Sequence, residues 1–420
     1  MLTYEDAVNT ILSTVTTLDA VSKRLLRCLG RVASESVYTD FDLPQVPASG
    51  PDGYAVRSLD VAAASQENPA ILRISGTARA GCVLKRRLEQ GAAIRIMTGA
   101  VVPAGADCVI RFEDTDEPRD KNGPNSNNPS HVKIFVSAKP GHNIRPAGSN
   151  VRKGTLIVPE GTVIGPTQIY ALAAVGKREI RIVRRPTVAI IATGDELINP
   201  GNRLAIGKTY NCNASTLASL VSYYGGIPRI LGIARDNEAS LTSKIKMGMK
   251  SDVIITSGGV SMGDYDLVRL VLGKLGKIVF SRIKMGPGAA VVFGTISRSA
   301  EDNGVPPIPV FSLAGPPAGC FINFETLVRP ALLKMRGITT VTHPQVEAIA
   351  LDSVPEKKKM TFVKYTRLQE KDGQHCVTLN ADNDTGMLAS IAAANSLTII
   401  PQGVAVNAGD NIGVLPLDWR

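Results

Sequence analysis

Three absences limit what this chain of 420 residues can do. Its six cysteines form no Cys-x-x-Cys pair and its four histidines lack ligand spacing, so neither a disulfide framework nor a zinc site is expected. Aromatic residues make up only 5% and the basic residues are scattered, which argues against a base-stacking nucleic-acid surface. No apolar run reaches the ~20 residues of a membrane span, and the N-terminus lacks a signal pattern. A cytoplasmic location is therefore predicted.

The composition predicts a soluble protein with several domains. The chain is longer than one hydrophobic core usually organises, and 44% apolar with 20% charged residues is typical of globular proteins. The net charge of +10 suits an anionic ligand and a nucleic acid equally well. Thr3 and Asp6 resemble a capping box, and apolar residues recur at helical spacing from Ala7 to Leu18, which predicts an amphipathic opening helix.

Short β-like runs follow, from about residue 42 to residue 139. They include Ala70–Ser75, Ala92–Ile96 and His131–Val136, and clusters of Gly, Pro and Asn separate them. This pattern predicts a small β domain. Residues 115–130 are expected to form a solvated loop within it, because Pro, Asn, Asp and Lys dominate there.

The pattern changes again beyond residue 180. Thr187–Ala192, Asp252–Thr256 and Ile308–Leu313 are continuous apolar runs separated by helix-length segments, as in parallel strands buried on both faces. After about residue 339 the helical patterns disappear. Alternating segments such as Leu397–Ile400 and Asn411–Leu415 then predict a small C-terminal β-barrel or sandwich.

Each of the three apolar runs ends in a loop rich in Gly, Pro, hydroxyl and acidic residues. The loops are Thr193-Gly-Asp-Glu-Leu197, Ser257-Gly-Gly-Val-Ser-Met-Gly-Asp-Tyr-Asp266 and Ala314-Gly-Pro-Pro-Ala-Gly319. Parallel strands present such loops at one edge of the sheet, so the three loops are expected to line one ligand site. Glycines let backbone N–H groups approach an anion, and Asp264 and Asp266 can hold a Mg²⁺ that bridges phosphates.

Simpler explanations exist for each loop taken alone. The segment from Ser257 to Asp266 can be a tight strand-to-helix turn with a capping Asp. Asp195 and Glu196 can supply metal-binding or acid–base oxygens, but Asp195 can equally cap a helix while Glu196 points to solvent. The combination of loops is more specific than any one of them.

That combination is accompanied by four more motifs, and the whole set closely resembles the molybdopterin molybdenumtransferase family, which includes bacterial MoeA and the gephyrin E domain. The resemblance covers nearly the whole chain and preserves motif order. The additional motifs are Pro51-Asp-Gly-Tyr-Ala-Val56, Ile96-Met-Thr-Gly-Ala100, Val102-Pro-Ala-Gly-Ala-Asp107 and Asn143-Ile-Arg-Pro-Ala-Gly148.

The resemblance implies a multidomain α/β plus β architecture. It comprises a discontinuous helical first domain, an inserted β domain, a MogA-like doubly wound parallel α/β domain that binds molybdopterin, and a C-terminal β-barrel. The expected boundaries are 1–41 with 140–180, 42–139, 181–338 and 339–420, respectively. The family forms an elongated homodimer, whose active cleft lies between the α/β domain of one subunit and the inserted β domain of the other.

The resemblance also implies a reaction. The family inserts molybdate into adenylylated molybdopterin and releases AMP with the help of Mg²⁺. A molybdopterin adenylyltransferase and molybdoenzyme apoproteins are the further partners it suggests, and no nucleic acid or membrane is expected.

Functional residues are carried over position by position. The expected catalytic residues are Asp52, Thr98, Glu196 and Asp266. The expected binding residues are Gly194, Asp195, Asn211, Ser257, Gly258, Gly259, Ser261, Pro287, Gly288, Gly315 and Pro316. The expected metal ligands are Asp264, Asp266 and Glu196.

Several motifs depart from the family pattern. Pro51 replaces a Met, Ser149-Asn150 replaces Glu-Asp, and Asn211 replaces an Asp. Lys-Pro-Gly-Lys-Pro becomes Gly286-Pro-Gly-Ala-Ala290, and Pro-Gly-Asn-Pro-Val-Ser becomes Ala314-Gly-Pro-Pro-Ala-Gly319. Two ammonium groups and two hydrogen-bonding side chains are lost, which should weaken the binding of the molybdate dianion.

Two hypotheses follow, with a third from another class. The chain is a working molybdenumtransferase, or it is a diverged paralogue that binds the pterin nucleotide or a protein partner without turnover. The third is a general nucleotide or RNA binder, which would show salt-sensitive affinity. Lys284 and Arg282 lie close in sequence to the lost lysines and can compensate for them. Cys212 and Cys320, within altered motifs, are interpreted as buried filler.

Overall fold

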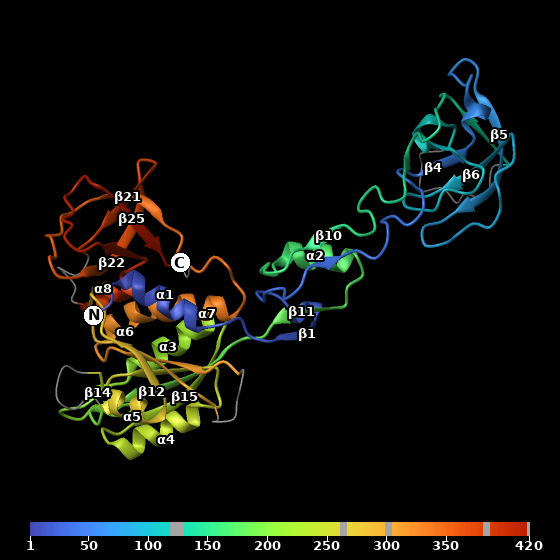
Figure 1. Cartoon of the computed structure of the whole chain (residues 1–420). Helices are drawn as coiled ribbons and strands as arrows, with labels where there is room; N and C mark the ends of the chain where they lie inside the picture. Colours follow the sequence, from blue (N-terminus) through green and yellow to red (C-terminus); the bar gives the residue numbers. More distant parts are fainter. Residues whose placement is uncertain (118–129, 261–266, 299–304, 381–386, 418–420) are drawn as a thin grey trace. The chain divides into compact units, whose positions relative to one another are not determined.

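The computed structural model describes residues 1–117, 130–260, 267–298, 305–380 and 387–417 (Figure 1). Its contacts define two compact units. The large unit comprises residues 1–35, 160–165 and 179–420, and the small unit comprises residues 36–159 and 166–178. The four domain boundaries expected from the sequence stay a prediction.

A six-stranded sheet forms the centre of the large unit. Its strands are β12 (Thr187–Thr193), β15 (Ile227–Ala234), β16 (Val253–Ser257), β17 (Lys277–Ser281), β19 (Val292–Ile296) and β20 (Ile308–Leu313). Their order is β15-β12-β16-β20-β19-β17, and β19 alone runs in the direction opposite to the other five strands. The three apolar runs are thus adjacent parallel strands, as predicted.

Helices cover both faces of this sheet. They are α3 (Cys212–Tyr223), α4 (Glu238–Gly248), α5 (Leu267–Leu275), α6 (Pro317–Asn323), the π-helix η4 (Phe324–Val328) and α7 (Arg329–Met335). Val188 and Ile190 of β12 pack in one core with α3, while Ala189 and Ile191 pack in the other with α4 and α5. Figure 1 shows α3, α6 and α7 on one side of the sheet and α4 and α5 on the other. The doubly wound α/β layer is confirmed.

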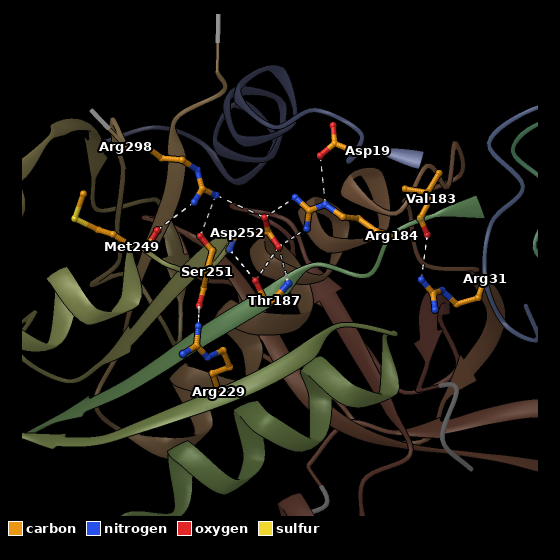
Figure 2. A network of polar contacts seen from close by, with 10 residues as sticks. All are labelled: Asp19, Arg31, Val183, Arg184, Thr187, Arg229, Met249, Ser251, Asp252 and Arg298. Carbon is orange, nitrogen blue, oxygen red and sulfur yellow. Dashed lines mark hydrogen bonds and ion pairs between the residues drawn. The ribbon is translucent and has the colours of Figure 1, made fainter. Parts of the chain in front are cut away.

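A network of charged side chains joins the beginnings of β12 and β16 (Figure 2). The Asp252 carboxylate is 7% exposed and accepts hydrogen bonds from both Arg184 Nη1 and Nη2 at 2.7 Å. It also accepts from the backbone N–H and hydroxyl of Thr187, each at 2.8 Å. Arg298 Nη2 lies 3.6 Å from the same carboxylate. These contacts join the neighbouring strands β12 and β16, whose opposite ends carry the predicted site.

The opening helix is confirmed, although it is shorter than the apolar spacing indicated. Helix α1 spans Tyr4–Thr14, and the Thr3 hydroxyl accepts a hydrogen bond from the Asp6 N–H at 3.1 Å. Val15 is already extended, so Leu18 lies beyond the helix. The buried side chains of α1 belong to the same core as α3 and α7. A strand pair follows, β1 (Ala20–Arg24) with β11 (Glu179–Val183), and the 3₁₀-helix η1 (Leu25–Arg27).

The C-terminal part of the large unit is a closed five-stranded barrel, as predicted. Its strands are β21 (Val346–Ala350), β22 (Thr361–Lys371), β23 (Gln374–Thr378), β24 (Ser396–Ile400) and β25 (Asn411–Pro416), and β22 pairs with both β23 and β24 to close it. Strand β18 (Met285–Gly286) adds to β22. The prediction that helices disappear after residue 339 is wrong, because α8 spans Met387–Ala393. Its seven residues are too short to produce a clear helical period.

The small unit is built around the predicted β sheet, whose order is β7-β4-β6-β5-β8. Its elements are β2 (Val37–Tyr38), β3 (Ala48–Ser49), β4 (Gly53–Val56), η2 (Ser58–Val61), β5 (Ala70–Ala78), β6 (Ala92–Ile96), β7 (Cys108–Arg111), η3 (Phe112–Asp114), β8 (His131–Ile134), β9 (Ile144–Arg145), β10 (Leu156–Val158) and α2 (Pro166–Ala174). The three runs named from the sequence correspond to β5, β6 and β8.

The expected solvated loop at residues 115–130 falls largely outside the described residues. At its described beginning Asp116 is exposed, as expected, but Thr115 is buried and Glu117 is half-buried. Glu117 has a side chain that is 11% exposed. It accepts hydrogen bonds from Arg95 at 2.7 and 3.1 Å and from the buried Tyr54 hydroxyl. The motif tyrosine Tyr54 is part of the core of the small unit, and its burial together with this contact raises its pKa.

Candidate active site at the sheet edge

A cavity of about 910 Å³ opens at the carboxyl ends of the parallel strands. It brings together the loops after β12, β16 and β20, as the sequence predicted, and adds the beginning of α3. Its described lining is Thr193, Gly194, Glu196, Leu197, Thr209, Tyr210, Asn211, Cys212, Asn213, Asp236, Ser257, Gly258, Gly259, Val260, Leu267, Leu270, Ala290, Ala314, Gly315, Pro316 and Pro317. Such a cavity has the size of a small-molecule site.

The glycine pair after β16 is required by close packing between strand ends. Gly258 and Gly259 have φ angles of +87° and +72°, which L side chains rarely adopt. A Cβ atom on Gly258 would lie 2.6 Å from the Thr193 carbonyl oxygen, and one on Gly259 would lie 2.8 Å from Val268 Cγ2. The Gly258 N–H donates to the Leu313 carbonyl at 3.2 Å. This N–H therefore joins two of the loops, and both glycines line the cavity, so their expected contact with a phosphate stays a prediction.

The N-terminus of α3 lines the same cavity. Asn211 is 3% exposed, and its side-chain oxygen accepts from the Ala214 N–H at 3.2 Å, so it serves as the N-cap. Asn213 donates to the Gly315 carbonyl at 2.9 Å and to Ser257 Oγ at 3.4 Å, which connects three of the lining segments. An α-helix N-terminus carries partial positive charge and unsatisfied N–H groups, which favour anions.

Cys212 and Cys320 differ in the structure. Cys320 is 2% exposed, and burial raises the pKa of its thiol. The filler interpretation is confirmed for Cys320. It is wrong for Cys212, which is exposed and lines the cavity. The first position of a helix leaves its side chain free to point outward, which residue type alone does not reveal.

The ionisable side chains of the described lining are acidic. Glu196 is exposed and folds back over Gly194, where an added Cβ would lie 2.4 Å from Glu196 Oε2. Asp236 accepts from the Asp195 N–H at 3.1 Å. Neither Lys nor Arg belongs to the lining that the structure describes, so Lys284 and Arg282 do not compensate there for the lost lysines.

Asp195, in the loop after β12, has neither of the roles considered for it from the sequence. Asp195 does not cap a helix, because the next element is the short strand β13 (Leu197–Ile198), which pairs with β14 (Thr209–Tyr210). Asp195 is exposed and is not part of the cavity lining.

Asp236 was missed by sequence reasoning. It follows β15, whose Pro228 and Gly232 interrupt the apolar run that would have identified a fourth strand end.

Pro287 and Gly288 lie beside the cavity and do not line it. The buried Asn323 side chain donates to the Gly288 carbonyl at 2.9 Å and accepts from the Ala314 N–H at 3.3 Å. A Cβ on Gly288 would lie 2.5 Å from Asn323 Nδ2. Asn323 thus holds the two substituted loops together, and no sequence motif pointed to it.

In the small unit, the structure brings Asp52 and Thr98 together. Asp52 Oδ1 accepts from the Thr98 N–H at 2.6 Å and from its hydroxyl at 2.9 Å. Both residues are exposed at the ends of paired strands β4 and β6. Ser261, Asp264 and Asp266 lie outside the described residues.

In the part of the chain that the structure describes, no group of three or more His, Cys, Asp and Glu residues is arranged to hold a metal ion. No helix within the described ranges has the length and apolar character needed to cross a membrane.

The fold and the cavity define the class of α/β proteins that bind ligands at the carboxyl edge of a parallel sheet. Comparison with known families is more specific. The MoeA N-terminal region (domains I and II) matches residues 2–176, a probable molybdopterin-binding domain matches residues 189–334, and the MoeA C-terminal region (domain IV) matches residues 347–417.

Relatives align along nearly the whole length. The chain is 31% identical to a molybdopterin molybdenumtransferase of Nostoc sp. over 99% of this chain and 94% of that protein. It is 32% identical to one from Bacillus subtilis over 92% of this chain and 87% of that protein. A solved structure of the molybdopterin biosynthesis MoeA protein from Pyrococcus horikoshii superimposes with a TM-score of 0.85 at 29% identity and covers 99% of both chains. This chain belongs to the molybdopterin molybdenumtransferase family of molybdenum cofactor biosynthesis.

Proposed function

We propose that this protein inserts molybdate into adenylylated molybdopterin and releases AMP. The observation that carries the proposal is the cavity in which the three strand-end loops meet the N-terminus of α3. The cavity is large enough for a pterin nucleotide fragment, and the helix N-terminus supplies positive potential for its phosphates. The predicted residues Gly194, Glu196, Asn211, Ser257 and Gly315 all line it.

The acidic lining fits a divalent cation. Glu196 and Asp236 offer carboxylate oxygens, which are the ligands that Mg²⁺ prefers, and no described cation competes with Mg²⁺ in the lining. We propose that these two residues hold Mg²⁺ together with Asp264 and Asp266. When bound, Mg²⁺ neutralises phosphate charge and stabilises the leaving AMP. The residues of this chain hold and orient the substrate around it.

The substituted loops present small and apolar groups to the cavity. Pro316 lines it where the family pattern has Asn, and Ala290 and Ala314 line it where the pattern has Pro. Backbone dipoles and the end of α3 would then have to hold molybdate without ammonium groups. We therefore propose that this chain binds molybdate less tightly than relatives that keep those side chains.

The quaternary arrangement is also a proposal. The family resemblance suggests a cytoplasmic homodimer in which Asp52 and Thr98 of one subunit act with the α/β domain of the other. Their exposed, hydrogen-bonded geometry supports a role toward a ligand. A molybdopterin adenylyltransferase, which supplies the substrate, and molybdoenzyme apoproteins, which receive the product, are the partners we propose.

The test is AMP release from adenylylated molybdopterin by the purified full-length protein with Mg²⁺ and molybdate. We expect Glu196→Gln to lower the rate at least ~10²-fold, because it removes a charged oxygen at the reacting phosphate. Glu238→Gln is the matched control. Glu238 lies in the first turn of α4, is paired with Lys274 at 2.5 Å and is outside the cavity lining.

A second candidate is a binding protein without turnover. The absence of Lys and Arg from the described cavity lining favours it, because molybdate would lack its ammonium partners. Pterin-nucleotide binding with no molybdate-dependent AMP release would support this candidate and contradict catalysis. Salt-sensitive RNA binding unaffected by Glu196→Gln would instead support a nucleic-acid binder.

A further inference from the structure

Three arginines gather at the C-terminal end of α3, at the other end of this helix from the cavity. Arg31, Arg185 and Arg336 come from distant parts of the sequence and are all half-buried. All three belong to the large unit. We call them the arginine cluster.

Backbone carbonyls hold the cluster in place. Helix α3 ends in a turn in which the Gly225 N–H donates to the Ser222 carbonyl at 3.0 Å and the Gly226 N–H donates to the Val221 carbonyl at 2.7 Å. Arg185 Nε donates to the Gly225 carbonyl at 2.8 Å, and its Nη2 donates to the Gly226 carbonyl.

The other two arginines approach the same turn. Arg336 donates to the Tyr224 carbonyl at 2.8 Å and to the Gly30 carbonyl at 2.6 Å. Its guanidinium lies so close to Gly225 that an added Cβ would be 2.5 Å from Arg336 Cζ. Arg31 follows Gly30 in the chain, and its Nη2 makes one long contact of 3.4 Å with the Val183 carbonyl.

The cluster has no acidic partner among the described residues. None of its guanidinium nitrogens lies within 4.0 Å of a described carboxylate oxygen. The neighbouring Arg184 shows the contrast, since it binds Asp252 and Asp19 (Figure 2). Figure 2 also shows Arg31 beside Val183, away from these carboxylates.

The three charges repel one another. Burial and then repulsion from Arg185 lower the pKa of Arg31 below its ordinary value, and burial with repulsion from Arg185 and Arg31 does the same for Arg336. All three still carry charge at neutral pH, because arginine titrates far above it. A helix C-terminus contributes only about −0.5 charge. It cannot balance three cations.

We propose that the arginine cluster is a binding site for a small oxyanion of the phosphate or sulfate type. Guanidinium groups present several N–H donors in a fixed plane, which matches the oxygens of such an ion. Arg31 uses only one weak contact to the protein, so its remaining donors are available. The site is independent of the proposed function, because it lies outside the cavity.

Thermal unfolding of the full chain tests this proposal. Phosphate or sulfate is titrated from about 0.1 to 20 mM, with chloride keeping the ionic strength constant. We expect a saturable rise in Tm of about 3 °C in the unchanged protein. Arg31→Gln should lose most of this rise and weaken oxyanion affinity by isothermal calorimetry about tenfold or more. Without oxyanion, its Tm should equal or exceed that of the unchanged protein.

The control is Arg24→Gln, because Arg24 is 72% exposed and lies 4.0 Å from Glu179 in the same unit. It should keep the full response. Oxyanion binding in the sheet-edge cavity would also survive Arg31→Gln, so the variant separates the two sites. An equal or non-saturating rise in the unchanged protein, Arg31→Gln and Arg24→Gln, or no rise in any of them, would overturn the proposal. Arg185 and Arg336 would then serve only as caps of α3.

Discussion

Replacing Asp252 with Asn should clearly destabilise the large unit. The effect should be larger than that of Asp19→Asn, the other replacement of an acid by its amide in the network of Figure 2. The Asp252 carboxylate receives two hydrogen bonds from Arg184 and two from Thr187, and it joins the first residues of β12 and β16. Asparagine keeps one acceptor for Thr187. Its amide group cannot accept the second guanidinium N–H, and the charge attraction is lost.

The size of the effect follows from these contacts. A hydrogen bond to a charged group contributes about 1.5–3 kcal/mol, and breaking a fully buried pair costs about 3–5 kcal/mol. Arg184 remains 31% exposed and keeps Asp19 at 3.4 Å, so water and a second carboxylate recover part of the loss. We expect a decrease of about 2–3 kcal/mol in the free energy of unfolding, which corresponds to about 4–10 °C in Tm.

Urea unfolding followed by far-UV circular dichroism measures this change, with Asp19→Asn as the matched control. Asp19 contacts the same arginine but is 87% exposed, so its replacement should change stability by less than about 0.5 kcal/mol. Equal, small effects of both replacements would refute the reasoning, because the buried geometry would then contribute nothing.

The same reasoning sets the pH dependence. Burial alone raises the pKa of Asp252, but the hydrogen bonds from Arg184 and Thr187 outweigh it and lower the pKa below the ordinary value. A depressed pKa stabilises the fold above the unfolded-state value, about 3.9. The stability difference between the unchanged protein and Asp252→Asn should therefore be constant from pH 7 to about 5 and shrink as the pH falls through the folded pKa.

Two further outcomes test the cavity. Gly258→Ala should lower the free energy of unfolding by about 2 kcal/mol or more and weaken pterin-nucleotide binding. The new methyl group would lie 2.6 Å from the Thr193 carbonyl oxygen, on a backbone in the left-handed region. An unchanged urea midpoint would contradict the close packing of the strand ends. Thiol labelling of the native protein should modify the exposed Cys82 and Cys212 and spare the buried Cys320 until urea unfolds the chain, and bound pterin nucleotide should slow labelling of Cys212 but not of Cys82.

Strong local patterns made much of the fold predictable. The runs that became β12, β16 and β20 are apolar throughout because both faces of these strands are covered, so their identity and mutual adjacency followed from the sequence. Strand β15 lies at the sheet edge and contains Pro228 and Gly232, so its run is broken and Asp236 after it was missed. Helix α8 was missed because seven residues carry too little periodicity.

Some site residues could be predicted from the sequence and others could not, for the same reason. Ser257, Gly258 and Gly315 follow predicted strands, so the parallel geometry alone brought them to one cavity. Asn323 could not be found, because its role depends on two loops that meet only in the folded chain. Cys212 and Cys320 are the same residue type, and only their positions on helices decide which is exposed.

By itself, the sequence determined the family, the parallel sheet and the edge at which its loops converge, because apolar runs and glycine-rich strand ends are local patterns. Tertiary structure alone decided which groups face the cavity, that its described ionisable lining is acidic, and that three distant arginines meet at the far end of α3. Contacts between segments from 40 to 306 residues apart depend on how the elements pack. No local pattern encodes them.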